Sequence, residues 1–321
     1  MRLVTASDVA NASALLAAAP AAARPVRTPL LPVPSTPDLL LKPENLQPTG
    51  AFKIRGAAHA LAALPEQERR RGVVAYSSGN HARAVAHAAR AFGVPATVVV
   101  PRTAPEAKLA ATRALGAEIV PVEVADRERR ARVIAAERGA RLVPPFDDRD
   151  VIAGQGTVGR EIVEDVAPDV VLVPVSGGGL ISGVAAAVKD AFPRVRVIGV
   201  EPELAADTGE SFRAGRRISW PVASRTRTAA DGLTAEPSEL TFAHVRQLVD
   251  DVVAVGEDEI DESVARIAAE CRVVAERSGA VAVAAHRHRA LPPGRAVAVV
   301  SGGNIDATQF AQLLDAGGAG R

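Results

Sequence analysis

Short, continuous apolar runs alternate with longer helical patterns along most of the chain. The valine-rich runs lie at residues 73–76, 96–100, 118–122, 170–175, 195–200 and 296–300. A glycine directly follows the helical patterns at 80–92, 104–115 and 126–138, as is usual just after a helix. Strands that are apolar along their whole length belong to parallel sheets covered on both faces. We therefore predict an α/β fold of open, twisted, mostly parallel sheets with helices on both faces.

The alternation of strands and helices starts twice, which indicates two domains. A first block, residues 66–146, contains three strand–helix pairs, and the pattern restarts beyond it. We expect 66–146 to form a small domain, and 1–65 together with 147–321 to form a large one, with a crevice between them. Five prolines lie between 24 and 37, where we expect a connection or an edge segment.

Composition and charge exclude several classes of protein. With 321 residues and a net charge of +1, the chain is long enough for two domains and gives no reason to expect nucleic-acid or membrane binding. The single cysteine, Cys271, excludes internal disulfides and cysteine-cluster metal sites. No apolar run approaches membrane-spanning length, and the first residues lack the pattern of a signal peptide. We expect a cytoplasmic protein.

Lys53 stands out because the chain has only four lysines. It follows Pro48 and Gly50 and opens an alanine-rich helical pattern, for which Thr49 is a candidate N-cap. In the first turn of a helix, unpaired backbone N–H groups and the positive helix end lower the pKa of an ammonium group. A lysine kept neutral in this way can form a Schiff base. The alternative is an ordinary surface lysine on an amphipathic helix.

Three of the predicted strands end in a turn that contains serine and glycine. The turns are Ser77-Ser78-Gly79-Asn80-His81, Ser176-Gly177-Gly178-Gly179-Leu180 and Ser301-Gly302-Gly303-Asn304. In open α/β sheets, ligands bind beyond the carboxyl ends of the strands. Glycine lets backbone N–H groups approach an anion, and the Gly177–Gly179 turn is the best phosphate site because a strand precedes it and a helix follows. Three such turns near Lys53 predict one shared ligand.

The stretch around Lys53 resembles the lysine motif of the threonine dehydratase and serine racemase family, which are pyridoxal 5'-phosphate (PLP) enzymes of the tryptophan-synthase-β type, or fold type II. It reads Gln-Pro-Thr-Gly-Ala-Phe-Lys-Ile-Arg-Gly-Ala over residues 47–57, and further motifs resemble the family over nearly the whole chain. The resemblance implies that PLP lies between the two domains. The implied cofactor-binding residues are Lys53, Phe52, Asn80, Ser176, Gly177, Gly178, Gly179, Leu180, Gly232, Glu276 and Ser301.

The resemblance also assigns individual roles. Lys53 would hold PLP as a Schiff base and act in catalysis together with Ser78. Asn80 would contact the phenolic oxygen of PLP, and Ser301 would contact its pyridine nitrogen. A neutral hydroxyl at that nitrogen leaves the ring largely unprotonated, which suits β-elimination. The implied substrate-binding residues are Ser77, Ser78, Gly79, Asn80 and His81.

The activity implied is the dehydration and deamination of a β-hydroxy amino acid, such as L-threonine or L-serine, to a 2-keto acid and ammonia by a homodimer. One alternative is a serine racemase, in which Ser78 would return a proton on the side opposite Lys53. Another is a dehydratase of an unusual substrate such as 3-hydroxyaspartate. β-Replacement is disfavoured because it uses a different lysine region, and a non-catalytic PLP or nucleotide binder would not need the lysine.

Two positions depart from the family pattern near the substrate turn. Arg83 stands where glutamine is more frequent, and Arg277 stands where proline or serine is usual. The resemblance therefore carries no specific substrate. The chain ends soon after its last predicted helix, so we expect no C-terminal regulatory domain and a catabolic type of enzyme.

Two further patterns have competing interpretations. Glu201, the carbonyl of Ala205 and Asp207 could bind a hard cation through oxygen, or simply start a helix. The resemblance to the racemase and related dehydratases implies Mg²⁺ or Ca²⁺ there. Gly154–Gly159 fits the dinucleotide pattern G-x-G-x-x-G, but no clear strand precedes it, so we expect the start of a packed helix.

Overall fold

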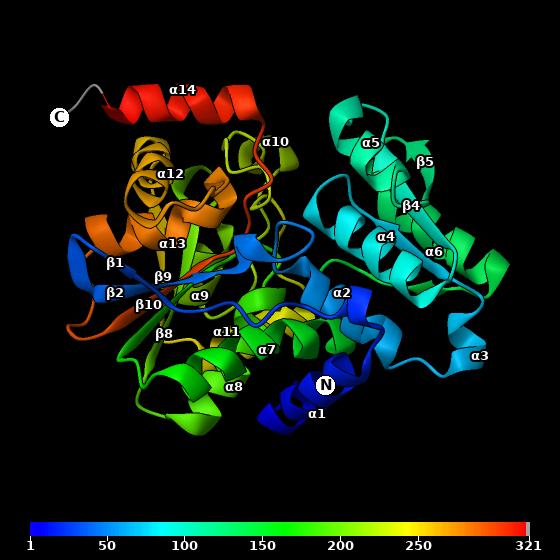
Figure 1. Cartoon of the computed structure of the whole chain (residues 1–321), viewed down its shortest axis with the longest axis horizontal. Helices are drawn as coiled ribbons and strands as arrows, with labels where there is room; N and C mark the ends of the chain where they lie inside the picture. Colours follow the sequence, from blue (N-terminus) through cyan, green and yellow to red (C-terminus); the bar gives the residue numbers. More distant parts are fainter. Residues whose placement is uncertain (319–321) are drawn as a thin grey trace.

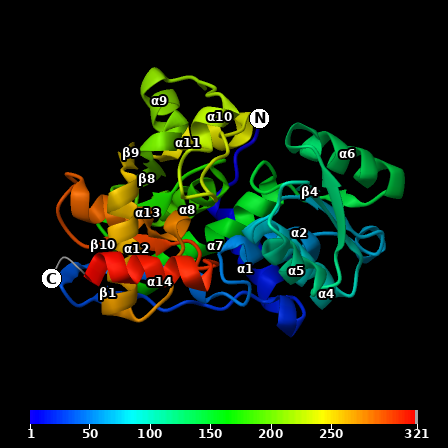
Figure 2. The same cartoon turned by 90° about the horizontal axis from the view of Figure 1, so that it is seen from above.

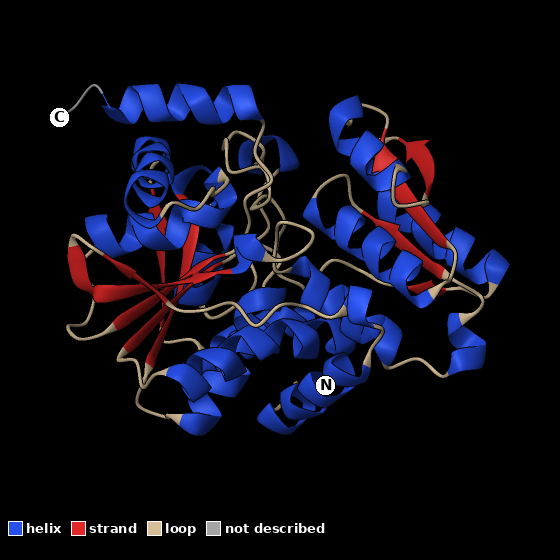
Figure 3. Ribbon diagram, in the orientation of Figure 1, coloured by secondary structure: helices blue, strands red, loops and turns tan. Residues whose placement is uncertain are grey.

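The computed structural model describes the backbone of residues 1–318 and the side chains of 1–106 and 109–316. Its strands form two separate sheets, with helices α2 and α7 between them (Figures 1 and 3). The larger sheet has six strands in the order β1 (Leu31–Val33), β2 (Thr36–Pro43), β10 (Ala296–Val300), β7 (Val170–Pro174), β8 (Arg196–Pro202) and β9 (Asp251–Val255). The smaller sheet has four strands in the order β5 (Glu118–Val122), β4 (Ala96–Pro101), β3 (Val73–Tyr76) and β6 (Arg141–Leu142).

All neighbouring strands are parallel except β1 and β2, which pair antiparallel at one edge. The predicted α/β fold with mostly parallel sheets is confirmed, and β1 is the edge segment expected among the prolines of 24–37. Each sheet draws on one of the two blocks expected from the sequence, and the domain boundaries at 65/66 and 146/147 stay a prediction.

Helices cover both faces of the six-stranded sheet. Successive strand residues point to opposite faces, so neighbouring residues of one strand pack against different helices. Leu172 and Ile198 pack with helices α12, α13 and α14, while Val171 and Val173 pack with α7, α8 and α11. Viewed from above, α14 lies alongside α12 (Figure 2). The helices have the bounds α7 (Arg149–Asp165), α8 (Gly179–Ala191), α11 (Glu239–Leu248), α12 (Glu257–Cys271), α13 (Arg277–His288) and α14 (Ala307–Gly318).

The four-stranded sheet is covered in the same way. Val98 packs with α2, α4 and α5, and Val99 with α6 on the opposite face. Gly93 and Gly139 end α4 and α6 in the left-handed conformation, as predicted from the sequence. These helices are α2 (Lys53–Ala62), α4 (Asn80–Phe92), α5 (Glu106–Arg113) and α6 (Arg127–Arg138). The remaining helices are α1 (Ala6–Ala18), α3 (Glu66–Arg69), α9 (Asp207–Ala214) and α10 (Val222–Arg225).

Helix α7 carries the pattern that resembles a dinucleotide motif. A Cβ atom on Gly154 would lie 2.6 Å from the carbonyl oxygen of Arg55, and one on Gly159 would lie 2.7 Å from that of Val184. The glycines therefore let α7 pack closely against α2 and α8. The prediction of a packed glycine-rich helix is confirmed, although the glycines lie along its middle. Among the described residues, no helix is both long and apolar enough to cross a membrane.

A buried ionic network ties α2 to α7 and β2. The Arg55 guanidinium donates to Glu44 through Nε (2.7 Å) and to Glu161 through Nη1 (2.6 Å), and Lys42 Nζ donates to Glu161 at 2.7 Å. Arg55, Lys42 and Glu44 are at most 1% exposed. Burial alone would raise the pKa of Glu44, but the charge and hydrogen bonds of Arg55, helped by Thr28, outweigh it and lower that pKa. The network fixes the helix that begins at Lys53.

Breaking this network should destabilise the fold strongly. Arg55→Met leaves Glu44 buried without its cation, so we expect the free energy of unfolding to fall by about 3–5 kcal/mol. Chemical denaturation of the purified proteins measures this change. The control is Arg160→Met, which removes a solvent-accessible partner of Glu164 on α7 and should cost less than about 1 kcal/mol. Equal losses in the two variants would contradict the interpretation.

Candidate active site

Lys53 is the first residue of α2, as the sequence predicted, but Thr49 does not cap this helix. Phe52 occupies the N-cap position, and the Thr49 hydroxyl donates instead to the carbonyl of Ala51 at 3.4 Å. The approach to the helix is held by the backbone N–H of Phe52, which donates to the Ser301 carbonyl at 3.0 Å. The hydrogen bond between the backbones of Phe52 and Ser301, and not a side-chain cap at Thr49, therefore fixes the segment before the helix.

The Lys53 side chain is partly buried between a backbone carbonyl and an aromatic ring. Its Nζ donates to the carbonyl of Pro145 at 2.8 Å and lies 4.9 Å from the centre of the Phe52 ring. Burial lowers the pKa of Lys53 to about 8, so an appreciable fraction of the amine is neutral near pH 7. The predicted direction is confirmed, although burial rather than the helix end is the cause.

The glycine turn before α8 forms an open helix N-terminus. Gly178 is the N-cap in the left-handed conformation, and no side chain caps the helix. A Cβ atom on Gly177 would overlap the ring of Phe146, and one on Gly179 would lie 2.8 Å from the Phe146 Cβ. Ser176 is held at the start of the turn, because its hydroxyl donates to the Ala235 carbonyl at 3.1 Å. The free N–H groups suit an anionic phosphate.

The turn at 77–81 joins β3 to α4 and lies beside Lys53. The hydroxyl of Ser77 accepts from the Gly79 N–H at 3.2 Å. His81 is buried, and its Nε2 donates to the Val143 carbonyl at 2.9 Å, while no hydrogen-bond partner for Nδ1 is found in the described part of the chain. Burial, with a smaller contribution from the charge of Lys53, lowers the pKa of His81 to about 3, so this imidazole is neutral.

Ser278 links two of the predicted cofactor-binding residues, Gly232 and Ser301. Ser278 accepts from the Gly232 N–H at 2.9 Å through its hydroxyl and from the Ser301 hydroxyl at 3.3 Å through its carbonyl. Glu276 accepts from Asn80 Nδ2 at 2.6 Å, which links α13 to α4. Sequence reasoning missed Ser278, although it lies two residues after Glu276, which the resemblance implicates.

Close contacts connect two of the three serine–glycine turns to the Lys53 segment, and the third, at 77–81, is joined to the Ser301–Asn304 turn by the hydrogen bond from Asn304 Nδ2 to Asn80 Oδ1 at 2.7 Å. The Ser301 carbonyl accepts from the N–H of Phe52, the residue before Lys53, and the Pro145 carbonyl accepts from the Lys53 amine. Phe146, next to Pro145, packs on the glycine turn. Sequence reasoning missed Pro145 because it contributes a backbone carbonyl, which leaves no side-chain signal. Ser78 and Leu180 lie in these turns as well, and the individual roles assigned to the site residues stay predictions.

The candidate cation site lies apart from these turns, at the end of β8. The carboxylate of Glu201 accepts from the backbone N–H groups of Gly209 (2.6 Å) and Thr208 (3.1 Å). Burial, with Asp207 contributing, raises the pKa of Glu201 to about 8, and burial raises that of Asp207 to about 7. Asp207 Oδ2 is buried, and the described residues offer it no hydrogen-bond partner. Arg225 compensates Asp207 only in part, and two buried carboxylates with raised pKa values fit a hard metal ion.

One finding limits the interpretation of Glu201 and Asp207 as a cation site. Within the described side chains, no group of three or more histidine, cysteine, aspartate or glutamate residues is arranged to hold a metal.

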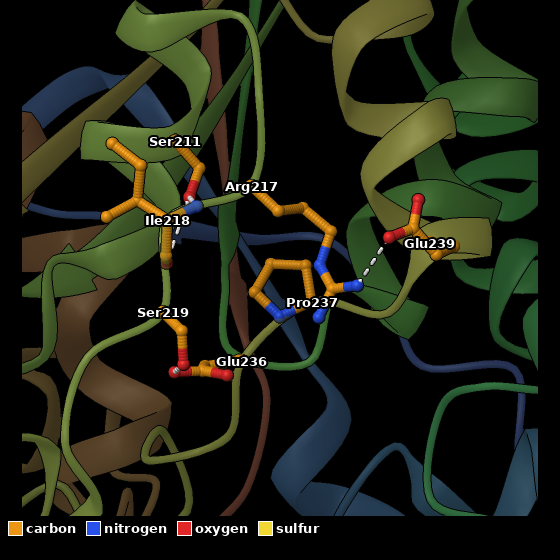
Figure 4. Close-up of a pocket in the computed structure, with 7 residues that line it drawn as sticks. All are labelled: Ser211, Arg217, Ile218, Ser219, Glu236, Pro237 and Glu239. Atoms are coloured by element: carbon orange, nitrogen blue, oxygen red, sulfur yellow. Dashed lines mark hydrogen bonds and ion pairs between the residues drawn. The ribbon is translucent and has the colours of Figure 1, made fainter.

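A cavity of about 260 Å³ lies next to α9, and Arg217 pairs with Glu239 at 2.7 Å across it (Figure 4). This cavity shares no residue with either predicted site. It is lined by Ser211, Arg217, Ile218, Ser219, Glu236, Pro237 and Glu239.

Comparison with known proteins decides the family. Residues 23–302 match the family described as pyridoxal-phosphate dependent enzyme. The chain belongs to this family. A lysine with a lowered pKa can form a Schiff base with an aldehyde, and an uncapped glycine turn at a helix N-terminus can hold a phosphate, so the residues present fit PLP.

Three relatives place the chain within the PLP-dependent family. It is 48% identical over 288 residues to an L-threonine ammonia-lyase of Thermotoga maritima, covering 87% of this chain and 70% of that protein. It is 41% identical to an L-threo-3-hydroxyaspartate ammonia-lyase of Saccharomyces cerevisiae, covering 86% of each. The solved structure of maize serine racemase superimposes with a TM-score of 0.88 at 36% identity, covering 98% of each chain. The resemblance stated from the sequence is confirmed, as is the fold type.

Adding a side chain to the glycine turn before α8 should weaken PLP binding. Gly177→Ala places a methyl group where Phe146 now lies, and the turn must shift to relieve the overlap. We expect the Kd for PLP to rise at least about tenfold, which corresponds to about 1.4 kcal/mol. Titration of the PLP-free protein with PLP measures this constant. Gly256→Ala is the matched control, since its Cβ would meet no atom closer than 3.7 Å; a similar Kd in both variants would contradict the assignment.

Proposed function

We propose that the protein is a PLP-dependent ammonia-lyase that dehydrates and deaminates a β-hydroxy amino acid, with L-threonine and L-serine as the first candidates. The observation that carries the proposal is the setting of Lys53, whose pKa is lowered to about 8 and whose Nζ donates to the Pro145 carbonyl, next to the Phe146 ring that packs on the glycine turn before α8. Two of the three relatives named above are ammonia-lyases, and the names of both contain a β-hydroxy amino acid.

Each part of the site has a task in this reaction. PLP, when bound, withdraws electrons from the substrate and so acidifies its α-proton. The neutral amine of Lys53 would remove that proton, and the hydroxyl group would leave the β-carbon as water on taking up one proton, so that the step gives up one proton and consumes one. The uncapped N-terminus of α8 holds the phosphate, and the turn at 77–81 binds the substrate carboxylate. The released enamine takes up water to give the 2-keto acid and ammonia, so the atoms balance.

The hydroxyl of Ser301 supports this reaction over chemistry that requires a long-lived carbanion. It is a neutral group, 4% exposed, and donates to a backbone carbonyl rather than to a charged side chain. A carboxylate at this position would stabilise a protonated pyridine ring, whereas a hydroxyl does not. Early loss of the β-hydroxyl group is then the favoured outcome.

The test is the production of 2-keto acid from L-threonine and L-serine by the PLP-loaded protein. We expect turnover of at least one of them, and we expect Lys53→Ala to abolish both turnover and the absorbance of lysine-bound PLP. Lys189→Ala, which removes a lysine at the far end of α8, should retain both properties. An intact absorbance in Lys53→Ala would contradict the assignment of this lysine.

The substrate experiment also separates the alternatives. If no keto acid forms from either amino acid, 3-hydroxyaspartate is the next substrate, because one relative carries that substrate in its name. Chiral chromatography of L-serine incubated with the enzyme detects racemisation, which the similarity to maize serine racemase makes the second candidate function. We also propose, on the resemblance alone, a homodimer that acts in the cytoplasm and in which 66–146 forms a small domain.

We further propose that Glu201, the Ala205 carbonyl and Asp207 bind Mg²⁺ or Ca²⁺. A cation would compensate two buried carboxylates and occupy the free Oδ2 of Asp207. We expect each ion to raise the Tm of the wild-type protein relative to chelator, because ligands that bind only the folded state stabilise it. Asp207→Asn should lose this shift, whereas Asp169→Asn, on the loop before β7, should keep it. A Tm indifferent to both ions would contradict the proposal.

A further inference from the structure

The amide of Asn304 is fully engaged between the two sheets. Its Nδ2 donates to Asn80 Oδ1 at 2.7 Å and to the Thr49 carbonyl at 2.9 Å, while its Oδ1 accepts from Arg83 Nη1 at 2.7 Å. These bonds use both amide hydrogens and the oxygen, so the orientation of the side chain is fixed. Gly50 makes room for it, because a Cβ there would overlap Asn304 Oδ1.

The Asn304 contacts determine how Asn80 lies. Because Asn80 Oδ1 accepts from Asn304, its Nδ2 is turned to the other side and donates to Glu276 at 2.6 Å. Asn80 is the first residue of α4 and closes the turn at 77–81. The side chains of Arg83, Asn304 and Asn80 therefore hold the start of α4 against the segment that leads to Lys53.

Arg83 lies where a cation is unfavourable for the helix alone. It is in the first turn of α4, whose N-terminus carries a positive partial charge. No acidic side chain occupies this turn, and Arg83 donates to the neutral amide of Asn304. The arginine therefore adds positive potential to the turn at 77–81, where the carboxylate of Glu276 accepts from Asn80 and is the opposing charge. This arrangement favours a bound anion.

We propose that Arg83 and Asn304 are positioning residues, which hold the turn at 77–81 against the Lys53 turn and thereby set the affinity for the carboxylate of the amino acid substrate. This inference rests on the proposed function, in which that turn binds the carboxylate. Neither residue transfers a proton. Their loss should weaken substrate binding more than it slows the reaction step carried out by Lys53.

The test compares Arg83→Met with Arg90→Met in the PLP-loaded enzyme. Both changes remove a guanidinium from α4, but Arg90 lies in the last turn and donates to the Ala114 carbonyl. We expect Arg83→Met to raise KM about tenfold, the effect of one hydrogen bond involving a charged group, with a much smaller change in kcat. Arg83→Lys, which keeps the charge, should recover part of this affinity, and Arg90→Met should match the wild type.

A second measurement separates positioning from direct contact with substrate. Hydrogen exchange of the PLP-loaded enzyme without substrate should quicken at the backbone amides of 77–81 in Arg83→Met and in Asn304→Ala, but not in Arg90→Met. The double variant Arg83→Met/Asn304→Ala should have the same KM and the same exchange rates as Asn304→Ala alone, because both single changes break the same linkage. A raised KM with unchanged exchange, or additive losses, would overturn the proposal.

The outcomes also distinguish this inference from the proposed function. If the wild type turns over no β-hydroxy amino acid, the proposed function fails, and the exchange measurement still tests whether Arg83 holds the turn. If the wild type is active and Arg83→Met has the same KM and exchange as Arg90→Met, the proposed function stands and the inference fails. A fall in kcat equal to the fall in kcat/KM would likewise contradict a role in binding alone.

Discussion

The charge balance between α2, α7 and β2 is the constraint on which the remaining structure depends. Two cations, Lys42 and Arg55, and two anions, Glu44 and Glu161, lie in the interior and compensate one another. Buried charges tolerate only geometries in which each has its partners, so they specify position more sharply than apolar packing does. Arg55 lies two residues beyond Lys53. The helix that presents the amine is therefore held from its inner side.

The same low polarity that makes the network demanding gives the site its chemistry. Removal of water from the Lys53 amine keeps part of it neutral, and burial keeps His81 neutral beside it. The groups that remain to attract anions are the backbone N–H groups at the starts of α4 and α8, together with the Arg83 guanidinium in the first turn of α4. Parallel strands bring these helix starts to the same edge of each sheet, where ligands of open α/β sheets bind.

Much of this arrangement could be predicted from the sequence, because local patterns encode it. Apolar runs predicted β3, β4, β5, β7, β8 and β10 but not β2, β6 or β9, and the glycines after α4 and α6 predicted the helix ends. The motif around Lys53 indicated the lysine itself. The failed cap at Thr49 shows the limit of such reasoning, since a backbone pairing between Phe52 and Ser301 holds that segment instead. Lys42 and Glu161 are 119 residues apart, and no local pattern announces that they meet.

Helix α7 has a consequence for the order in which the chain folds. Glycine destabilises a helix by about 1 kcal/mol relative to alanine, and α7 contains three of them within six residues. Isolated helices of this length are marginal even with favourable residues, so α7 gains its order from the neighbours that its glycines admit. The ribosome completes α7 before α8 exists. The partner of Gly154, α2, is already present at that point, whereas the partner of Gly156 and Gly159, α8, is not, so we expect α7 to reach its full order only when the following strand and helix have been synthesised and can dock against it.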